Sequence, residues 1–362
     1  MSPDPAAEWL VPQQCAGRAA TLPARCYVDA AFAALERDAV FGKSWQLVAH
    51  AAQVGDAGDH AVAEIACVPL VVVRGVDGAL RALHNVCRHR AGPLATCDGR
   101  GARVLTCRYH GWTYALDGAL RGAPGMHGAE AFDVAAIRLP QAQVAEWHGL
   151  VFAARDAAPP FEDLVAGVEA RLGALAFDGY VFDRRVSYEL ACNWKVYVDN
   201  YLEGYHLQRV HPALARLLGG SRYRTQCAAW HVLQSSPLDP AAGPYGESGH
   251  AAEAQYWWLW PNTMLNLLPG RLQTNRVIPL DAQRCRVEFD YYYAPGTDPR
   301  TASQDREFAD QVQSEDSAIC EAVQRGLASG SYDRGRLNPA QEAGVFRFHE
   351  LLRAAYRARF GG

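Results

Sequence analysis

The sequence predicts an α+β protein in which a small all-β domain is inserted near the start of a larger domain. In the larger domain, helices should flank an antiparallel sheet in a helix-grip-like arrangement. Residues 45–154 consist of short apolar runs separated by turn signals, whereas beyond residues 156–160, a stretch rich in Ala, Pro and acidic residues, the apolar spacing lengthens to helical periods. We expect residues 1–44 to pack on the larger domain, residues 45–156 to form the β domain, and residues 157–362 to form the larger one.

The elements follow from local patterns. In the β domain, the dipeptides Asp77-Gly78 and Asp117-Gly118 are hairpin signals. A helix is expected before this domain, at residues 29–36. Beyond the boundary, we expect helices and antiparallel strands in the following order: a helix at residues 194–218, strands at 256–268, 272–280 and 285–293, and helices at 305–327 and 339–359.

Composition limits the possible partners and the compartment. The 362 residues carry a formal charge of -4 and are 49% hydrophobic, which is ordinary for a globular enzyme and offers no basic surface for nucleic acid or anionic lipid. Residues 1–11 lack a basic stretch followed by an apolar one, the pattern expected of a leader, and no apolar run reaches membrane-spanning length. We therefore expect a cytoplasmic protein without nucleic-acid or membrane partners. Most of its ten cysteines are scattered singly, as buried thiols of a reducing compartment often are.

Two mixed doublets carry the strongest chemical signal. Cys87 and His89 form the first, Cys107 and His110 form the second, and seventeen residues separate them. Two thiolates on one iron and two imidazoles on the other are the ligand set of a Rieske [2Fe-2S] cluster, whose reduction potential exceeds that of all-cysteine clusters. Zinc is the alternative. Zinc motifs usually repeat a C-x2-4-C spacing, however, and each doublet here mixes one Cys with one His.

A second set of metal ligands is expected in the larger domain. Two histidines and one carboxylate on one face of an iron leave positions open for oxygen, as in non-haem Fe(II) oxygenases. His206 and His211 can supply the imidazoles, but a spacing of five residues does not share one face of a regular α-helix. We therefore expect a π-type bulge or a helix end near residues 207–210. The alternative is that His206 is a surface residue and that His211 merely ends the helix before Pro212.

Asp316 is the candidate for the carboxylate. It falls at helical spacing in a stripe of apolar residues that comprises Val312, Ile319, Val323 and Leu327. A carboxylate on such a stripe is disfavoured unless it binds a cation, although it could also be an ordinary acid at the edge of the stripe.

Glu203 lies one turn before His206 and could accept a hydrogen bond from the outer nitrogen of that imidazole, or it could bind the metal directly. We prefer the bridging role, because Asp316 already supplies a carboxylate.

With both ligand sets in one chain, the sequence resembles the catalytic α subunits of Rieske non-haem iron oxygenases over nearly its whole length. The resemblance implies a Rieske domain, a mononuclear iron domain and electrons from NAD(P)H through a separate flavin/iron-sulfur reductase. It also implies a head-to-tail homotrimer in which Glu203 links His206 to His110 of the adjacent subunit. We expect Asn200 to lie beside the iron ligands and Trp112 to cover the cluster.

Within that family, the segment 260–266 and the pair Thr274-Asn275 resemble the branch that acts on choline, glycine betaine and carnitine. Trimethylammonium groups bind to the faces of aromatic rings, and aromatic residues cluster near the proposed pocket. The candidates for substrate binding are Tyr201, Tyr205, Trp258 and Trp260, with Tyr256 and Trp257 in the same cluster. The alternative for each is packing in the core.

The resulting hypothesis is a monooxygenase that uses O2 to hydroxylate or N-demethylate a small quaternary ammonium compound. Two alternatives remain open from the sequence. A ring hydroxylase or O-demethylase for aromatic acids would use the same metals, and an electron carrier would need only the β domain.

Overall fold

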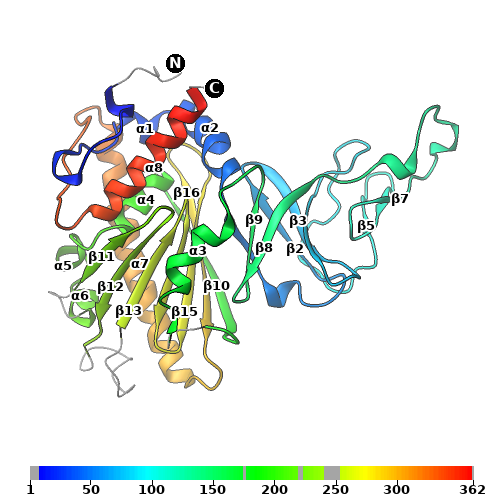
Figure 1. Ribbon diagram of the computed structural model, residues 1–362. Coiled ribbons are helices and arrows are strands. Elements are labelled where there is room, and N and C mark those ends of the chain that lie inside the picture. The colour runs from blue at the N-terminus through cyan, green and yellow to red at the C-terminus, as the bar shows by residue number, and fades with distance from the viewer. Residues whose placement is uncertain (1–7, 174–176, 219–222, 240–252, 361–362) are drawn as a thin grey trace. The chain divides into compact units, whose positions relative to one another are not determined.

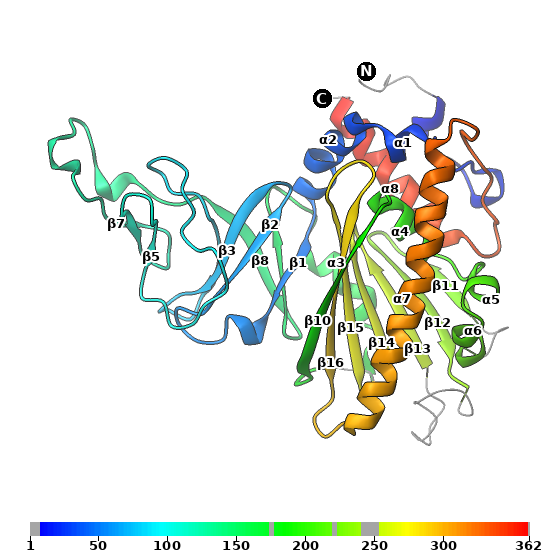
Figure 2. The ribbon, with the colours of Figure 1, turned by 180° about the vertical axis from the view of Figure 1, so that it is seen from behind.

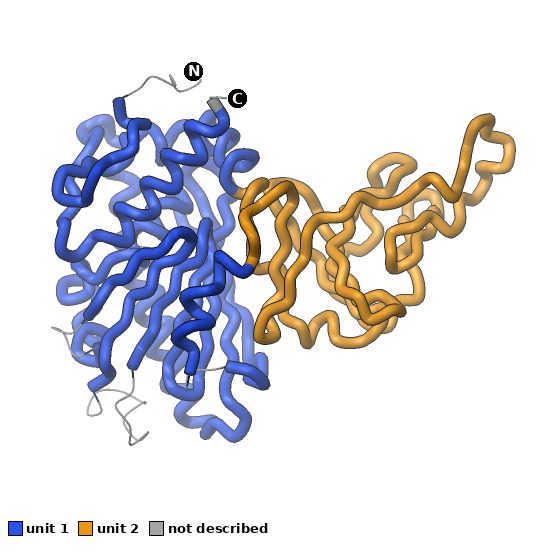
Figure 3. Tube along the Cα trace, in the orientation of Figure 1, with its two compact units in different colours: residues 1–40, 162–362 blue, residues 41–161 orange. Residues whose placement is uncertain are grey.

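The computed structural model describes residues 8–173, 177–218, 223–239 and 253–360. The chain divides into two compact units (Figure 3): unit 1 comprises residues 1–40 and 162–362, and unit 2 comprises residues 41–161. We expected the boundaries at 44/45 and 156/157. The crossing segments belong to unit 2 because they contact one another there. The N–H of Asp156 donates to Gly42 O at 3.0 Å, and the rings of Trp45 and Phe161 meet edge to face.

Unit 2 is built from antiparallel strands (Figure 1). One sheet has the order β1-β9-β8-β4-β3-β2 and a smaller sheet has the order β5-β6-β7. The strands are β1 (Gln46–His50), β2 (His60–Ile65), β3 (Val68–Arg74), β4 (Leu80–His84), β5 (Leu105–Thr106), β6 (Thr113–Tyr114), β7 (Leu120–Gly122), β8 (Gln141–Trp147) and β9 (Leu150–Ala154).

The turns of unit 2 explain which strand pairs the sequence could predict. Gly78 joins β3 to β4 and Gly118 joins β6 to β7, both with positive φ, as the two Asp-Gly signals indicate. The hairpin between β2 and β3 instead turns through Ala66 and Cys67, which also have positive φ. Nothing in an Ala-Cys pair signals such a turn, so the pairing of the flanking strands determines it.

Unit 1 combines a seven-stranded antiparallel sheet with helices. The sheet order is β10-β16-β15-β14-β13-β12-β11. Its strands are β10 (Val181–Leu190), β11 (Arg224–Cys227), β12 (His231–Pro237), β13 (Glu253–Leu259), β14 (Thr263–Leu268), β15 (Arg271–Pro279) and β16 (Cys285–Tyr293). The helices are α1 (Arg25–Val28), α2 (Ala30–Ala39), α3 (Phe161–Glu169), α4 (Trp194–Tyr201), α5 (Leu207–Val210), α6 (Pro212–Leu217), α7 (Pro299–Ala328) and α8 (Ala343–Phe360).

The long helix α7 runs across one face of this sheet, and α3 lies against the opposite face (Figures 1 and 2). On the face with α7, the side chains of α4 and α8 meet those of the sheet: Phe348 of α8 contacts the rings of Trp194 and Trp258. On the other face, His231 of β12 hydrogen-bonds the carbonyl of Leu164 in α3. A long helix held against a sheet is the helix-grip-like arrangement that we expected.

The N-terminal segment packs on unit 1 through a buried polar centre. Glu36 of α2 accepts hydrogen bonds from the indole of Trp194 and the ammonium of Lys195, each at 2.7 Å, and from the hydroxyl of Tyr356. Because Glu36 and Lys195 are both buried, each charge is stabilised by the other. The hydrogen bonds of this buried centre connect α2, α4 and α8.

Helix boundaries in unit 1 differ from the expectation most clearly around the two histidines. Instead of one helix at residues 194–218, α4 ends at Tyr201, the one-turn helix α5 ends at Val210, and α6 begins at Pro212. The carboxylate of Glu203 accepts the backbone N–H groups of Tyr205 and His206, which replaces the helical bonds there. Of the two expected irregularities, the structure therefore has a helix end at Val210, and the described residues contain no π-helix.

Two further expectations change. The predicted strand at 256–268 is a hairpin, because β13 and β14 are separated by a turn with a cis Trp260-Pro261 bond. The prediction of an apolar stripe along α7 is wrong at Val323, whose side chain is 44% exposed. The buried face of α7 instead carries polar residues with partners: Gln313 accepts from Tyr197 Oη at 2.7 Å, and Gln324 accepts from Asn193 N–H at 2.9 Å.

Among the helices of the described part of the chain, none combines the length and the apolar character that a membrane crossing requires.

Candidate active site

The two Cys/His doublets occupy matching turns in unit 2. Cys87 O accepts the N–H of Ala91 at 3.0 Å, and Cys107 O accepts the N–H of Gly111 at 2.9 Å. Ala91 and Gly111 both have positive φ, which allows each turn to close. Gly92 allows the turns to approach, because a Cβ atom at this position would lie 2.8 Å from Cys107 Sγ. The sequence therefore presents both doublets in the same local geometry.

The side chains at these turns suit an iron-sulfur cluster. Both cysteines are buried, and the rings of His89 and His110 have centroids 4.6 Å apart. His89 Nδ1 is buried and has no hydrogen-bond partner among the described residues, which is costly unless that nitrogen binds a metal. Trp112 stacks on His89 with a centroid separation of 4.8 Å, as expected for a residue that covers the cluster.

Tyr114 hydrogen-bonds a cluster cysteine. Its hydroxyl accepts the backbone N–H of Arg88 at 2.9 Å, so its own hydrogen can be donated to Cys87 Sγ, 3.3 Å away. Burial raises the pKa of Tyr114, and the hydrogen bond to Cys87 raises it further, so the phenol keeps that hydrogen. Hydrogen bonds to the sulfurs are one of the means by which a protein sets a cluster's potential.

A second donor group lies in unit 1. His206, His211 and Asp316 bring one nitrogen or oxygen atom each to within 4.8 Å of the others. Asp316 Oδ1 lies 2.9 Å from His211 Nε2 and 3.9 Å from His206 Nε2. Two imidazoles and one carboxylate gathered in this way match the two-histidine, one-carboxylate set of a non-haem iron. The break in the helix brings the two histidines together despite their spacing.

A carboxylate lies behind each imidazole. His206 Nδ1 is 2.6 Å from Glu203 Oε1, and His211 Nδ1 is 2.6 Å from Glu315 Oε2. Such bonds fix the proton on Nδ1 and leave Nε2 as the metal-binding atom. The sequence indicated Glu203 for this role, but we did not anticipate Glu315. Its position next to Asp316 could have suggested it only once the packing of α7 was known.

Neighbouring polar and charged groups contact His211 and Asp316. Burial lowers the pKa of His211, but the hydrogen bonds and charges of Asp316 and Glu315 outweigh burial, so its pKa lies above the ordinary value. Asn200 donates to Asp316 Oδ1 at 2.5 Å, as its expected place beside the ligands implies. A divalent cation among these groups would offset the concentration of carboxylates.

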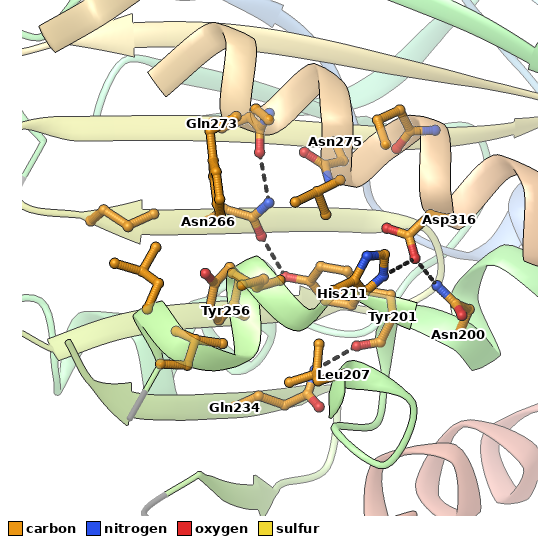
Figure 4. Close-up of a pocket in the computed structure, with 18 of the residues that line it drawn as sticks. Asn200, Tyr201, Leu207, His211, Gln234, Tyr256, Asn266, Gln273, Asn275 and Asp316 are labelled. Carbon is orange, nitrogen blue, oxygen red and sulfur yellow. Dashed lines mark hydrogen bonds and ion pairs between the residues drawn. The ribbon is translucent and has the colours of Figure 1, made fainter. Parts of the chain in front are cut away.

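A cavity of about 110 Å³ adjoins this donor group (Figure 4). Its walls combine aromatic and apolar side chains with a row of amides. Tyr201 is part of its wall: the phenol donates to Asn266 Oδ1 at 2.7 Å, and Asn266 donates to Gln273 at 2.8 Å. Gln234 donates to the backbone oxygen of Tyr201 at 2.6 Å. Figure 4 shows these bonds, which fix the ring of Tyr201 in the wall.

The structure places the other aromatic candidates elsewhere. Trp258 and Trp260 pack with Phe348 in a buried aromatic cluster, and Tyr205 is 57% exposed at the surface, so these three do not line the cavity. The physical reason is position: the cavity reaches along β13 to Tyr256, whereas Trp258 and Trp260 lie farther along, under α8. The sequence did not indicate four further aromatic residues that line it, namely Tyr197, Tyr223, Phe289 and Phe308.

Comparison with known families agrees with both donor sets. The family model described as "Rieske [2Fe-2S] domain" matches residues 44–138. The model described as "Ring hydroxylating alpha subunit (catalytic domain)" matches residues 177–358. The fold and the two sites thus define the catalytic subunit of a Rieske non-haem iron oxygenase, and the chain belongs to that family.

Its relatives include choline and carnitine monooxygenases. The chain is 35% identical to the chloroplastic choline monooxygenase of Arabidopsis thaliana, over 92% of this chain and 82% of that protein. It is 33% identical to the carnitine monooxygenase oxygenase subunit of Escherichia coli (strain K12), over 93% and 94%. This protein is therefore a member of the Rieske non-haem iron monooxygenases, with a Rieske cluster, a mononuclear iron and electrons from a separate reductase.

Solved structures of Rieske oxygenases share this fold. The quaternary ammonium Rieske monooxygenase CntA in complex with its substrate L-carnitine superposes with a TM-score of 0.84 at 29% identity, covering 96% of this chain and 99% of that one. Naphthalene 1,2-dioxygenase from Rhodococcus sp., at 18% identity and a TM-score of 0.76, shares the fold.

Glu315, the carboxylate that contacts His211, is predicted to support iron binding. Glu315→Gln should weaken retention of the mononuclear iron about tenfold or more, because the amide no longer provides a negative partner for the Nδ1–H group. Iron content after dialysis against a graded series of chelator concentrations measures this. Glu307→Gln, an exposed position on the same helix, is the matched control. Equal retention in both variants would show that Glu315 does not support the site.

Proposed function

We propose that the protein oxidises a small quaternary ammonium compound in the cavity of unit 1, by hydroxylation or N-demethylation. The observation that carries this proposal is an aromatic cavity that directly adjoins the His206, His211 and Asp316 donors. The relatives described above, a choline monooxygenase and a carnitine monooxygenase oxygenase subunit, support it further.

The lining suits a trimethylammonium group. Tyr201, Tyr223 and Tyr256 present aromatic rings to the cavity, and burial raises the pKa of each phenol, for Tyr256 to about 12. The phenols are therefore neutral near pH 7. Neutral aromatic faces attract a cation that has no N–H group to donate, and they cost little desolvation of their own.

The roles of the metal-binding residues follow from their geometry. Cys87, His89, Cys107 and His110 would hold the cluster, and His206, His211 and Asp316 would hold the mononuclear iron. When bound, this iron supplies the positions at which O2 is activated for insertion of one oxygen atom. Glu203 and Glu315 orient the two imidazoles, and Asn200 holds the carboxylate of Asp316. The aromatic walls place the substrate beside the three donors and exclude water.

The route for electrons is part of the proposal. Glu203 lines the cavity and also a hollow on the surface of unit 1, together with Tyr205, His206 and Arg209. A carboxylate at this point can bond His206 on one side and an incoming group on the other. Assembly as a head-to-tail homotrimer would bring His110 of the adjacent subunit to Glu203. Inter-subunit electron transfer in a quaternary ammonium Rieske monooxygenase of similar structure supports this.

Oxygen uptake tests the substrate class. With a reductase and NAD(P)H, substrate-dependent uptake should be seen with trimethylammonium compounds such as choline or γ-butyrobetaine, and not with benzoate or a methoxybenzoate, because the cavity favours a cation. Product analysis by mass spectrometry distinguishes turnover from uncoupled oxygen consumption. Uptake with the aromatic acids alone would contradict the proposal and favour a ring hydroxylase or O-demethylase.

The bridge is tested separately. Glu203→Gln should retain both metal centres, yet it should lower the single-turnover rate of the prereduced enzyme about tenfold or more, because the carboxylate no longer joins the two imidazoles. Rapid-mixing oxidation of the cluster measures that rate. Glu162→Gln, an exposed position on α3, is the control. An unchanged rate with full metal content would remove Glu203 from the electron path.

A further inference from the structure

A second hollow, of about 180 Å³, lies on unit 2 beside the second Cys/His doublet. Its lining includes Thr106 and Arg108, the residues on either side of Cys107, but neither His89 nor His110. A molecule seated in this hollow would therefore contact the backbone that carries a cluster thiolate and leave the histidine side of the cluster site free. Neither substrate binding nor the proposed bridge to the adjacent subunit uses this surface.

The hollow of unit 2 has an exposed apolar centre. Val104 and Tyr109 both line it, and they are 42% and 57% exposed. Large apolar side chains that lie exposed around one hollow mark a contact surface, whereas single ones are ordinary. The surface is small, as are those of the weak, short-lived complexes that electron-transfer proteins form.

Arginines surround this centre. Arg108 lines the hollow, and the guanidinium carbon of Arg90 lies 5.4 Å from the ring centroid of Tyr109. Arg103 directly precedes Val104 in the chain. All three arginines are exposed, and none of them has an ion pair within the described part of the chain. The described residues that line the hollow include no acidic side chain. In a chain with a net charge of -4, this is a local concentration of positive charge.

The charges favour a partner other than a second copy of this chain. The hollow of unit 1 beside Glu203, where the adjacent subunit is proposed to bind, is lined by one acid and one base among its described residues, Glu203 and Arg209. It therefore offers no excess of negative charge to three arginines. The separate reductase must approach the cluster closely enough to transfer electrons, so a reductase with an acidic face suits this surface.

We propose that the hollow of unit 2 is the docking site of the electron-donating domain of the reductase, and that this domain presents an acidic face to it. The docking surface consists of Arg90, Arg103, Val104, Arg108 and Tyr109. In each encounter one electron passes: the iron-sulfur centre of the donor is oxidised by one electron and the cluster is reduced by one. The electron enters on the side of Cys107, and His110 stays available for transfer onward to the adjacent subunit.

Such a surface makes the encounter depend on salt. Unpaired charges around a small apolar contact raise the association rate by steering the partner, and they add less to the lifetime of the complex. Their field extends about 30 Å at 0.01 M ionic strength and about 8 Å at 0.15 M. The reduction of the cluster by an acidic protein should therefore slow as the ionic strength rises.

The test uses a prereduced acidic plant-type [2Fe-2S] ferredoxin as the probe and the oxidised holoenzyme, mixed rapidly without oxygen. Freeze-quenched magnetic resonance distinguishes the two clusters. At 0.01 M ionic strength, Arg103→Gln/Arg108→Gln should lower the second-order rate of cluster reduction about tenfold or more, and added salt should narrow the difference from wild type. Calorimetric Kd values for the oxidised ferredoxin should rise in parallel, which gives a readout apart from electron transfer.

Two controls accompany this variant. Dithionite, a small reductant that needs no docking surface, should reduce the cluster of the double variant and of wild type at similar rates, which shows that the cluster is intact. Arg300→Gln is the matched substitution, because Arg300 is an exposed arginine of unit 1 that has no ion pair within the described residues. It should leave the rate and the Kd unchanged.

Two results would overturn the inference. The first is a double variant whose rate, Kd and salt dependence equal those of wild type. The second is a double variant that loses its assembly in sedimentation while the ferredoxin still reduces its cluster at the wild-type rate, because the arginines would then belong to a contact between copies of the chain.

Discussion

The active site depends on the hydrogen bonds that hold the outer nitrogens of two imidazoles. Glu203 fixes His206 and Glu315 fixes His211, each at 2.6 Å, and only then do both Nε2 atoms point toward Asp316. Glu203 also accepts the backbone N–H groups of Tyr205 and His206, which lie just before the start of α5. One side chain thus breaks the helix, orients a ligand and reaches the surface hollow. Removing the break would return the two histidines to different faces of a helix.

The parts of this site that are encoded locally could be predicted from the sequence. Each Cys/His doublet lies in a turn made by its own neighbours, so its spacing alone indicates the cluster. His206, His211 and Glu203 lie within nine residues of one another, and the five-residue spacing of the histidines indicated the helix end at Val210, although not the earlier end of α4 at Tyr201. Asp316 could be identified because a carboxylate among apolar neighbours on a helix requires an explanation, even though the proposed stripe was wrong at Val323.

The parts of the site that depend on tertiary packing could not be predicted from the sequence. Glu315 contacts His211 across 104 residues of sequence, and nothing in the pattern of α7 distinguishes it from the other acids of that helix. Trp258 and Tyr256 both belong to β13, but α8 covers the first and the cavity adjoins the second. Aromatic content therefore indicated Tyr201 and Tyr256, which line the cavity, but could not separate them from Trp258 and Trp260, which do not. The pairing of Arg271 with Asp305 likewise exists only because β15 and α7 pack together.

The central claim is that unit 1 holds a mononuclear iron through His206, His211 and Asp316, separate from the cluster of unit 2. The most direct measurement is the iron content of His206→Ala, taken together with its cluster spectrum at low temperature. The account predicts that the variant loses the mononuclear iron and its turnover while the spectrum of the histidine-ligated cluster stays unchanged. A variant that retains all of its iron and its activity, or that loses the cluster instead, would contradict it.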